Sequence, residues 1–330
     1  MENVFYFNKI MIEEVTPFKI FAGTQGEGIA QRICDYLGCS LGKVKIDRFS
    51  DGEFAVSYEE SVRGKTVYLV QSTRPSSDNL MELLLMIDAA KRASAYKIIA
   101  IIPYFGWARQ DRKDKPRVSV GAKLVANIIQ KAGADRIITV DLHAEQIEAF
   151  FDIPVDNLYA SNQLANYIVD YDLDNYIFAS PDVGGSKRAS AFVKKIHQLT
   201  HKDMPMVICY KSRPKYNQVG EINILGDVKG KNVIIVDDIA DTAGTLCLAA
   251  QTMMKQGALS VMAMVTHGIM SGPACERIEA SELTKLVFTD TVPFDASRCS
   301  KVHIVSVAEI IAQTISAIQE HRSVSELNIH

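Results

Sequence analysis

The amino-acid sequence predicts an α/β protein of two tandem domains, each a mainly parallel sheet flanked by helices. Three observations support this fold class. The chain has 330 residues, enough for two domains of ordinary size. Apolar strand-like runs alternate with helix-like segments almost throughout, which is typical of parallel sheets with helical connections. A short internal repeat indicates that one half of the chain resembles the other.

The expected strands are short apolar runs bounded by turn-forming residues. They lie at residues 66–71, 98–103, 136–140, 176–180, 206–210, 232–236 and 259–266. The expected helices carry apolar residues at helical spacing, at residues 80–93, 120–132, 187–199 and 246–256. This alternation of strands and helices favours a parallel sheet in each half.

The internal repeat pairs residues 60–70 (ESVRGKTVYLV) with residues 226–236 (GDVKGKNVIIV). After each segment come a polar loop, an apolar helix and a further strand, in the same order. The match is short, but this shared order favours a tandem duplication. We expect one domain at residues 18–160 and a second at 161–320, and the last helix could pack back on the first domain.

Composition excludes several classes of protein. The net charge of −3 gives no global reason to expect a nucleic-acid partner, so any anion site must be local. Six cysteines are scattered without CxxC spacing, which favours reduced thiols over disulfides or zinc. The first fifteen residues lack the apolar core of a signal peptide, and no run approaches the ~18 apolar residues of a membrane span. We therefore expect a soluble, cytoplasmic protein without a membrane partner.

The most informative segment is VIIVDDIADTAGTL at residues 233–246. Its apolar start predicts a buried parallel strand. Thr242, Gly244 and Thr245 then offer hydroxyls and backbone N–H groups at a helix N-terminus, which suits a phosphate. Asp237 and Asp238 are acceptors suited to sugar hydroxyls or a cation. Asp and Thr are also ordinary helix caps, but a capped turn leaves the aspartate pair unexplained, so we favour a ribose-phosphate site.

Two further segments suit a nucleotide. Phe49-Ser50-Asp51-Gly52-Glu53 has the Asp-Gly signal of a simple hairpin, although its acids and aromatic ring could also hold an adenine. Residues 104–117 contain aromatic side chains and then five Lys or Arg within nine residues, after an expected strand. A solvated charged loop is the alternative, but this pattern at the carboxyl end of a strand favours a nucleotide polyphosphate.

Single polar residues follow other expected strands. His143 comes after the strand at 136–140, and Asp182 comes after the strand at 176–180 and before a Gly-Gly turn. A lone histidine is more often simply hydrogen-bonded, yet these two side chains could share Mg²⁺ with phosphate oxygens. Lys211 and Arg213 follow the strand at 206–210. Their segment could be an ordinary hairpin tip, or a cationic loop that closes over a phosphoryl group.

Taken together, these motifs closely resemble the ribose-phosphate pyrophosphokinase family, whose members make phosphoribosyl pyrophosphate. Five motifs stand in the family's order, at residues 49–53, 104–117, 140–143, 180–185 and 236–245. The resemblance covers residues 18 to 320 and implies two phosphoribosyltransferase-type domains. It also implies that ATP and ribose 5-phosphate react to give AMP and phosphoribosyl pyrophosphate, with Mg²⁺ as the cofactor. The family commonly forms hexamers, which implies a homo-oligomer.

The resemblance implies a role for each motif. Phe49, Asp51, Gly52, Glu53, Arg109 and Gln110 would bind ATP. Arg213, Asp237, Asp238, Asp241, Thr242, Ala243, Gly244 and Thr245 would bind ribose 5-phosphate. His143 and Asp182 would ligate the metal, and Lys211 and Arg213 would be catalytic. Many family members have two consecutive arginines after the loop lysine, whereas Ser212 interrupts them here.

Three alternatives differ in what the sequence should contain. A phosphoribosyltransferase would share residues 237–245 but would need no nucleotide site in the first half. An inert regulatory member of the same family should be damaged at His143, Lys211, Arg213 or residues 241–245, and these are intact. A nucleic-acid binder should show a continuous basic face, which the sequence lacks. The sequence therefore favours the synthase over the regulatory homologue.

Overall fold

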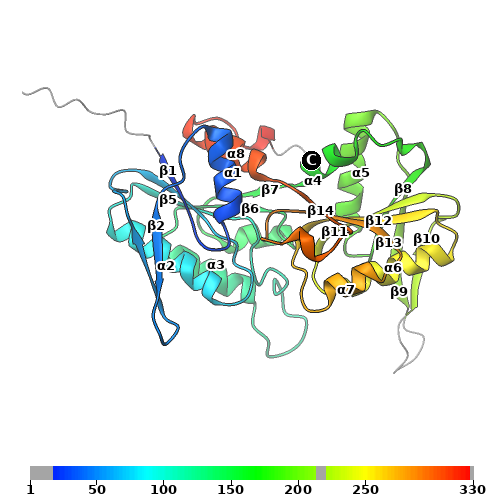
Figure 1. The fold of residues 1–330 in the computed structure, drawn as a ribbon, viewed down its shortest axis with the longest axis horizontal. Coiled ribbons are helices and arrows are strands. Elements are labelled where there is room, and N and C mark those ends of the chain that lie inside the picture. Colours follow the sequence, from blue (N-terminus) through cyan, green and yellow to red (C-terminus); the bar gives the residue numbers. More distant parts are fainter. Residues whose placement is uncertain (1–17, 213–220, 328–330) are drawn as a thin grey trace, which may run out of the picture.

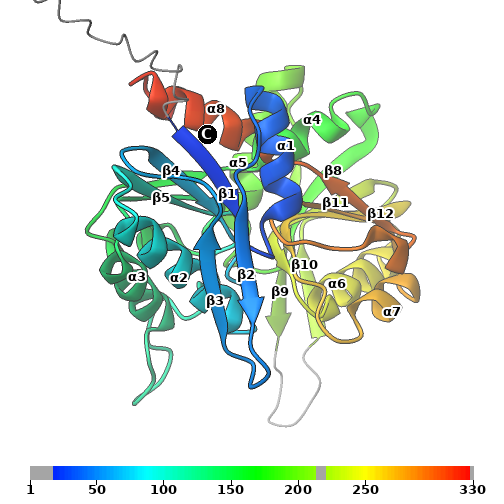
Figure 2. The same cartoon turned by 60° about the vertical axis from the view of Figure 1, so that its left-hand side comes forward.

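The computed structural model describes residues 18–212 and 221–327 of the chain. Two sheets lie side by side along the longest dimension of the molecule (Figure 1). Helices cover both faces of each sheet, and a two-stranded ribbon projects from the first half (Figure 2). The carboxyl ends of several strands from both sheets meet between the halves, where several of the polar motifs gather.

The first sheet has five parallel strands in the order β1-β4-β5-β6-β7. The strands are β1 (Phe18–Ala22), β4 (Thr66–Val70), β5 (Lys97–Ile102), β6 (Arg136–Val140) and β7 (Val155–Leu158). The helices are α1 (Glu27–Leu37), α2 (Asp78–Arg92) and α3 (Gly121–Ala132), followed by the short 3₁₀ helix η1 (Glu145–Phe150). The ribbon consists of β2 (Val44–Arg48) and β3 (Phe54–Tyr58), which pair antiparallel.

Alternation along β4 explains why both faces of the first sheet are covered. Tyr68 and Val70 belong to the apolar cluster beneath α1, while Val67 and Leu69 belong to the cluster beneath α2 and α3. All four side chains are fully buried. A strand buried on both faces is a continuous apolar run, which is the pattern that predicted this strand.

The second sheet has seven strands in the order β10-β9-β8-β11-β12-β13-β14, and only the β9–β10 pair is antiparallel. The strands are β8 (Tyr176–Ser180), β9 (Met206–Ser212), β10 (Glu221–Leu225), β11 (Asn232–Ala240), β12 (Ser260–Gly268), β13 (Leu283–Thr289) and β14 (Val302–Val305). The helices are α4 (Ser161–Ile168), α5 (Ser186–Thr200), α6 (Gly244–Lys255), α7 (Ala274–Glu279) and α8 (Ala308–Gln319). The 3₁₀ helices are η2 (Leu173–Asn175), η3 (Ala296–Arg298) and η4 (Ser325–Leu327).

The two halves repeat one topology. The order β1-β4-β5-β6-β7 matches β8-β11-β12-β13-β14 strand for strand. In each half the first strand leads to a helix and then to an antiparallel hairpin, β2–β3 or β9–β10. The predicted fold class of two tandem α/β domains is therefore confirmed. The halves differ in their hairpins, because β9–β10 extends the second sheet whereas β2–β3 stands apart from the first.

A shared core joins the halves on one side of the sheets. One cluster of buried residues includes Ile20 and Ile33 of the first half together with Phe178 and Ile311 of the second. Helix α8 packs against α1 in this cluster, as Figure 1 shows. Gln319 at the end of α8 donates a hydrogen bond to the Tyr68 hydroxyl at 2.8 Å. The last helix of the second half thus stabilises the first.

All the predicted strands and helices are present, and most of their ends differ from the predicted bounds by a few residues. The largest extension is in β11, which runs to Ala240 rather than Val236 and so includes the aspartate pair. A last helix was expected without bounds and is α8, whereas α1 was not predicted; both helices bury apolar faces. Among the described residues, no helix is long and apolar enough to cross a membrane.

The α1–α8 contact gives a test of the shared core. Ile311 is fully buried in it, so Ile311→Ala should lower the free energy of unfolding by about 2–5 kcal/mol through lost burial and a residual cavity. Urea unfolding followed by circular dichroism measures this change. The matched control is Ile128→Ala in α3, where 38% of the residue is exposed and the expected loss is smaller. Equal losses in the two variants would contradict a shared core at α8.

Candidate active site

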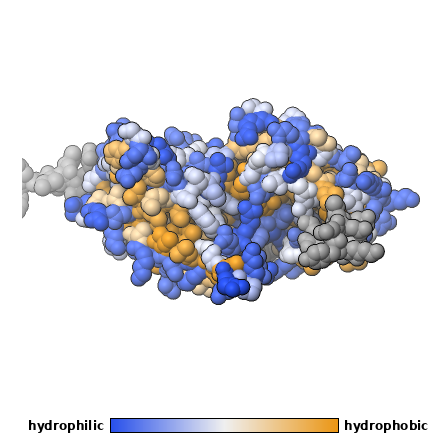
Figure 3. Space-filling view, turned by 90° about the horizontal axis from the view of Figure 1, so that it is seen from below, coloured by the Kyte–Doolittle hydropathy of each residue, from blue (hydrophilic) through white to orange (hydrophobic). Residues whose placement is uncertain are grey.

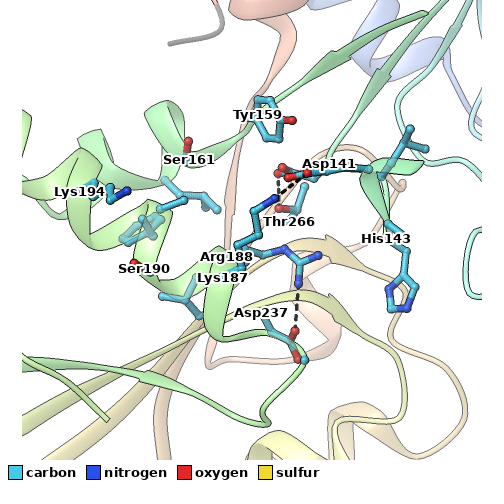
Figure 4. A pocket seen from close by; sticks show the side chains of 18 of the residues that line it. Asp141, His143, Tyr159, Ser161, Lys187, Arg188, Ser190, Lys194, Asp237 and Thr266 are labelled. Carbon is cyan, nitrogen blue, oxygen red and sulfur yellow. Dashed lines mark hydrogen bonds and ion pairs between the residues drawn. The ribbon is translucent and has the colours of Figure 1, made fainter. Parts of the chain in front are cut away.

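The candidate site lies where strands of both sheets end. A cavity of about 790 Å³ opens there, lined in part by Asp141, His143, Arg188, Asp237 and Thr266 (Figure 4). These residues follow β6, begin α5, or end β11 and β12. Ligands in open α/β sheets bind outside the carboxyl ends of strands. Here two such edges face each other, so the cavity belongs to both halves.

The adjacent Asp237 and Asp238 occupy different environments at the end of β11. Asp238 is 5% exposed, and its Oδ2 accepts a hydrogen bond from His143 Nδ1 at 2.6 Å. Arg188 Nη1 lies 3.1 Å from Asp238 Oδ1 and 3.5 Å from Asp237 Oδ1. Asp237 Oδ1 also accepts from the Asp238 backbone N–H at 2.9 Å.

These contacts separate the acidities of the two carboxyls. Burial and the neighbouring Asp238 charge hold the pKa of Asp237 well above its usual range. Burial also opposes ionisation of Asp238, but the His143 hydrogen bond and Arg188 outweigh it and hold the pKa of Asp238 far below its usual range. Asp238 is therefore the firmly ionised member of the pair.

Asp141, two residues before His143 in the chain, joins the two sheets by hydrogen bonds. Its Oδ2 accepts hydrogen bonds from the Thr266 hydroxyl at 2.6 Å and from the Ala160 backbone at 3.1 Å. Its backbone has φ of 43°, which turns the chain sharply after β6. Its carbonyl accepts from His267 Nε2 at 3.1 Å. The position of His143, two residues later, is thus fixed by contacts with β12.

His267 is a buried neutral histidine in this junction. Its Nε2 donates to the Asp141 carbonyl, so Nδ1 is the acceptor for the Thr291 hydroxyl at 2.9 Å. Burial lowers the pKa of His267, although nearby Asp141 acts in the opposite direction. The ring of Tyr104, from the first half, meets the imidazole edge to face at 4.9 Å.

The loop at residues 241–245 leads into α6 as predicted. Ala243 has φ of 57°, and the helix begins at Gly244. Arg277 donates to the Thr242 carbonyl, and the Asp241 carbonyl accepts from Ser271 N at 2.9 Å, so the loop is held from outside. N–H groups at a helix N-terminus and adjacent hydroxyls can bind a phosphate.

Arg109 crosses from the first half to this loop. Its Nη1 donates to Asp241 Oδ2 at 2.7 Å. Burial would raise the pKa of Asp241, but hydrogen bonds from Arg109 and Ser271 lower it overall. A second cavity, of about 500 Å³, is lined in part by Arg109, Gln110 and His143. Arg109 and His143 thus line the second cavity together with other residues of the basic segment at residues 104–117. Each also contacts an aspartate in or just before the phosphate-type loop at residues 241–245, Asp241 and Asp238 respectively.

The hairpin motif lies elsewhere in the chain. Phe49, Asp51, Gly52 and Glu53 form the exposed tip between β2 and β3, where the Glu53 N–H donates to Asp51 Oδ1 at 3.0 Å. The tip projects from the molecule (Figure 2) and does not line either cavity. A single chain thus brings Arg109 and Gln110 to the second cavity and leaves the other predicted nucleotide residues outside both cavities.

The two residues predicted to hold a metal have different partners. His143 contacts Asp238, whereas Asp182 is exposed and accepts the Gly185 N–H at 2.8 Å. Oxygens of Asp182 and Asp237 lie 3.6 and 3.8 Å from the point where a Gly185 β-carbon would stand, so both flank the same turn. Within residues 18–212 and 221–327, no three His, Cys, Asp or Glu side chains group as a metal site. Mg²⁺ needs only one or two protein ligands beside substrate and water.

The two residues predicted to be catalytic lie at or just beyond the end of a described segment. Lys211 belongs to β9, where it is opposite Ile222 of β10. Arg213 lies outside the described residues. Three residues of the site were not predicted to have roles, namely Asp141, Arg188 and His267. Arg188 could have been found as a basic residue in the first helical turn that follows Gly184–Gly185. Nothing in the local sequence distinguishes His267.

Tandem parallel-sheet domains, with paired aspartates before a phosphate-type loop, define a protein built on phosphoribosyltransferase-type domains. Residues 18–133 match the N-terminal domain of ribose phosphate pyrophosphokinase, and residues 176–328 match the phosphoribosyl synthetase-associated domain. The chain belongs to the ribose-phosphate pyrophosphokinase family, as the sequence motifs indicated.

Relatives and a solved structure agree with this assignment. A ribose-phosphate pyrophosphokinase of Porphyromonas gingivalis is 56% identical over 94% of this chain and 97% of its own length. One of Chlorobaculum tepidum is 50% identical over 94% of this chain and 95% of its own. The crystal structure of phosphoribosylpyrophosphate synthetase from Mycobacterium smegmatis superposes with a TM-score of 0.85 at 35% identity, covering 92% of this chain and 99% of that one.

The buried His267 predicts a pH-dependent stability. Because its folded pKa is lowered, the contribution of this group is complete above the ordinary histidine pKa and is lost as pH falls towards the folded value. His267→Gln removes the titrating group, so its stability deficit relative to the native chain should be larger at pH 8 than at pH 5.5. Denaturant midpoints at both pH values measure this. A deficit independent of pH would contradict a buried neutral His267.

Proposed function

We propose that this chain is a catalytically active ribose-phosphate diphosphokinase. It transfers the β,γ-diphosphoryl group of ATP to the C1 hydroxyl of ribose 5-phosphate, giving AMP and phosphoribosyl pyrophosphate for nucleotide biosynthesis. The observation that carries the proposal is the junction of Arg109 and His143 from one half with residues 237–245 from the other. Membership of the family and intact motifs support the same activity.

Ribose 5-phosphate would lie at the end of β11 and the loop that follows it, next to the large cavity that Asp237 lines. Thr242, Ala243, Gly244 and Thr245 at the start of α6 would hold its 5-phosphate through N–H and hydroxyl donors. Asp237 would accept hydrogen bonds from the ribose hydroxyls, while Asp238 and Asp241 would act within the ion pairs already described. In this arrangement C1 of the sugar would lie towards the side that carries Arg109 and His143.

ATP would occupy the first half, with Arg109 and Gln110 at its phosphates. Phe49, Asp51, Gly52 and Glu53 remain our proposed contacts for the adenine, although the hairpin tip lies outside the cavity of its own chain. We therefore propose a homo-oligomer, a hexamer by family resemblance, in the cytoplasm. Apolar surface gathers over α2 and α3 (Figure 3), where Met81 and Leu124 are more than half exposed, and this supports association.

The residues present fit Mg²⁺. His143 and Asp182 are the proposed protein ligands, and the oxygens of Asp182 and Asp237 on either side of Gly185 are donors of the type that this cation prefers. When bound, Mg²⁺ would neutralise charge on the phosphate oxygens. The hydrogen bond to Asp238 uses Nδ1 of His143, which leaves Nε2 as the ring atom that can reach a cation.

The chemistry is a displacement at phosphorus. The C1 hydroxyl oxygen forms a bond to the β-phosphorus while the bond from that phosphorus to the oxygen bridging the α-phosphate breaks. AMP leaves with the bridging oxygen, and the hydroxyl proton is released. Reactions of this type depend on positioning and on neutralised charge. We propose Lys211 and Arg213 as the cations that stabilise the transferring group, and their segment as the element that covers it.

A ³¹P NMR time course with the purified protein, ATP, Mg²⁺ and ribose 5-phosphate tests this proposal. We expect AMP and a new diphosphate ester to appear together, and only when ribose 5-phosphate is present. Intact ATP, with inorganic phosphate added as a possible activator, would instead favour an inert regulatory homologue. ADP with a monophosphorylated product would mean an ordinary kinase and would overturn the proposed mechanism.

Substitution in the loop before α6 should separate the two substrates. Gly244→Val places branched methyl groups at the proposed phosphate seat, where even a β-carbon stands 3.4 Å from Arg277. The KM for ribose 5-phosphate should rise at least tenfold, while the KM for ATP should stay within about threefold, since one lost charge-assisted hydrogen bond costs roughly 1.5–3 kcal/mol. Steady-state kinetics measure both, and Gly28→Val in α1 is the control. A larger effect on ATP would reverse the two pockets.

Lys211 should affect turnover more than binding. Lys211→Ala removes a cation proposed to act on the transition state, so kcat should fall roughly 10²–10³-fold while ATP affinity changes only a few-fold. Single-turnover kinetics and equilibrium ATP titration measure the two effects. The control is Lys97→Ala, because Lys97 is an exposed lysine at the start of β5, the end of the strand away from the site. Equal losses of affinity and turnover would argue against a transition-state role.

A further inference from the structure

We propose that Arg188 is a positioning residue that gives the adjacent Asp237 and Asp238 different roles. Arg188 and His143 hold Asp238 as the link between the two halves, and Asp237 is thereby left to receive the sugar. This inference rests on the proposed function, because it specifies how the ribose-binding carboxylate is prepared. It adds Arg188 to the site and removes Asp238 from direct contact with the sugar.

The contacts divide the two aspartates clearly. Both oxygens of Asp238 are engaged, Oδ1 by Arg188 at 3.1 Å and Oδ2 by His143 at 2.6 Å. The contacts that Asp237 makes among the described residues use Oδ1, with the Asp238 backbone and Arg188. Asp237 also lines the large cavity, and its side chain is more exposed than that of Asp238, at 19% against 7%. Asp237 is therefore the carboxyl that a sugar hydroxyl can reach.

Arg188 is held in place by its own segment. It lies in the first turn of α5, after the Gly184–Gly185 turn that follows β8. Its side chain is 27% exposed, and Figure 4 shows it directed at Asp237 across the cavity. The guanidinium reaches both carboxyls through one nitrogen, Nη1. A fixed planar cation can serve two neighbouring acceptors, whereas the compact ammonium of lysine acts as a single point charge on a flexible stem.

Charge explains why such a residue is needed. Two adjacent carboxyls in a half-buried site disfavour each other's ionisation, and a buried carboxylate without a counter-charge is costly. Without Arg188, the side-chain partner left to Asp238 among the described residues would be the imidazole of His143. Asp238 would then compete for the substrate's metal or hydroxyls, and His143 would lose its fixed acceptor. The effect on catalysis would therefore act through Asp238 and not through direct contact with substrate.

The neighbouring Lys187 provides a matched control. It stands next to Arg188 in the same turn and lines the same cavity. Its side chain, however, is 81% exposed and pairs with Glu145 at 2.7 Å. Exposed pairs of this type contribute little to stability. Removing the charge at position 187 thus changes the total charge of the cavity by the same amount without disturbing the aspartate pair.

The test is a double-mutant cycle with Arg188→Met, Asp238→Asn and the two combined. Arg188→Met keeps the length of the side chain but removes its charge, so we expect kcat/KM for ribose 5-phosphate to fall roughly 10²-fold. The double variant should recover at least tenfold of that loss, because the neutral amide introduced by Asp238→Asn needs no counter-charge. Lys187→Met should stay within twofold of the native chain. Millimolar guanidinium should partly restore Arg188→Ala, which a purely structural defect would not allow.

Three outcomes would overturn the proposal. If the losses in the double variant multiply, Arg188 acts independently of Asp238. If Arg188→Met changes only the KM for ATP, Arg188 contacts the nucleotide. If thermal unfolding shows that lost activity equals lost folded protein, Arg188 is only structural. Calorimetric titration of ribose 5-phosphate repeats the cycle without turnover. Should the native chain bind the sugar but convert no ATP, the proposed function fails while the Arg188 proposal is still decided by that titration.

Discussion

The hydrogen bonds around Asp141 are the contact on which the rest of the site depends. This residue directly follows β6 of the first sheet, yet its carboxylate and carbonyl both accept hydrogen bonds from β12 of the second, through Thr266 and His267. Because the chain turns sharply at Asp141, the same contact sets the path that carries His143 to Asp238. The two parallel sheets are thereby joined at their carboxyl ends, which is where each sheet alone would present a ligand site.

A junction of this kind explains why one duplicated fold has unequal halves. Both halves have the same strand order, but the aspartate pair at the end of β11 and the phosphate-type loop after it occur only in the second half. The corresponding segment after β4 instead takes part in the interface, where the Ser72 hydroxyl donates to the Thr291 carbonyl. The first half has therefore kept the architecture and contributes side chains to a site whose loop is in the second half.

Much of the fold and part of the candidate site could be predicted from the sequence, for identifiable reasons. Strands such as β4 and β11 are buried on both faces, so they are continuous apolar runs, and the loop before α6 combines turn formers with phosphate donors over a few adjacent residues. The remainder depends on contacts between distant positions. His267 meets a residue 126 positions away, and Arg109 meets Asp241 at a separation of 132. Local spacing does not encode such pairs. The Phe49–Glu53 tip lies outside both cavities of its own chain, so its assignment to the nucleotide stays a prediction.

The distribution of charge shows what the second half gains from the first. A site for a phosphorylated sugar contains three carboxylates, those of Asp237, Asp238 and Asp241, which by themselves would repel an anion. Each is offset by a partner from another element: Arg188 for both members of the pair, His143 for Asp238, and Arg109 for Asp241. Two of these three partners belong to the first half. Because His143 and Arg109 reach Asp238 and Asp241 only when the halves are docked, the second half has its full set of counter-charges only in the presence of residues from the first. A phosphate-type loop on one domain thus becomes a site for two substrates by sharing its counter-charges with the other.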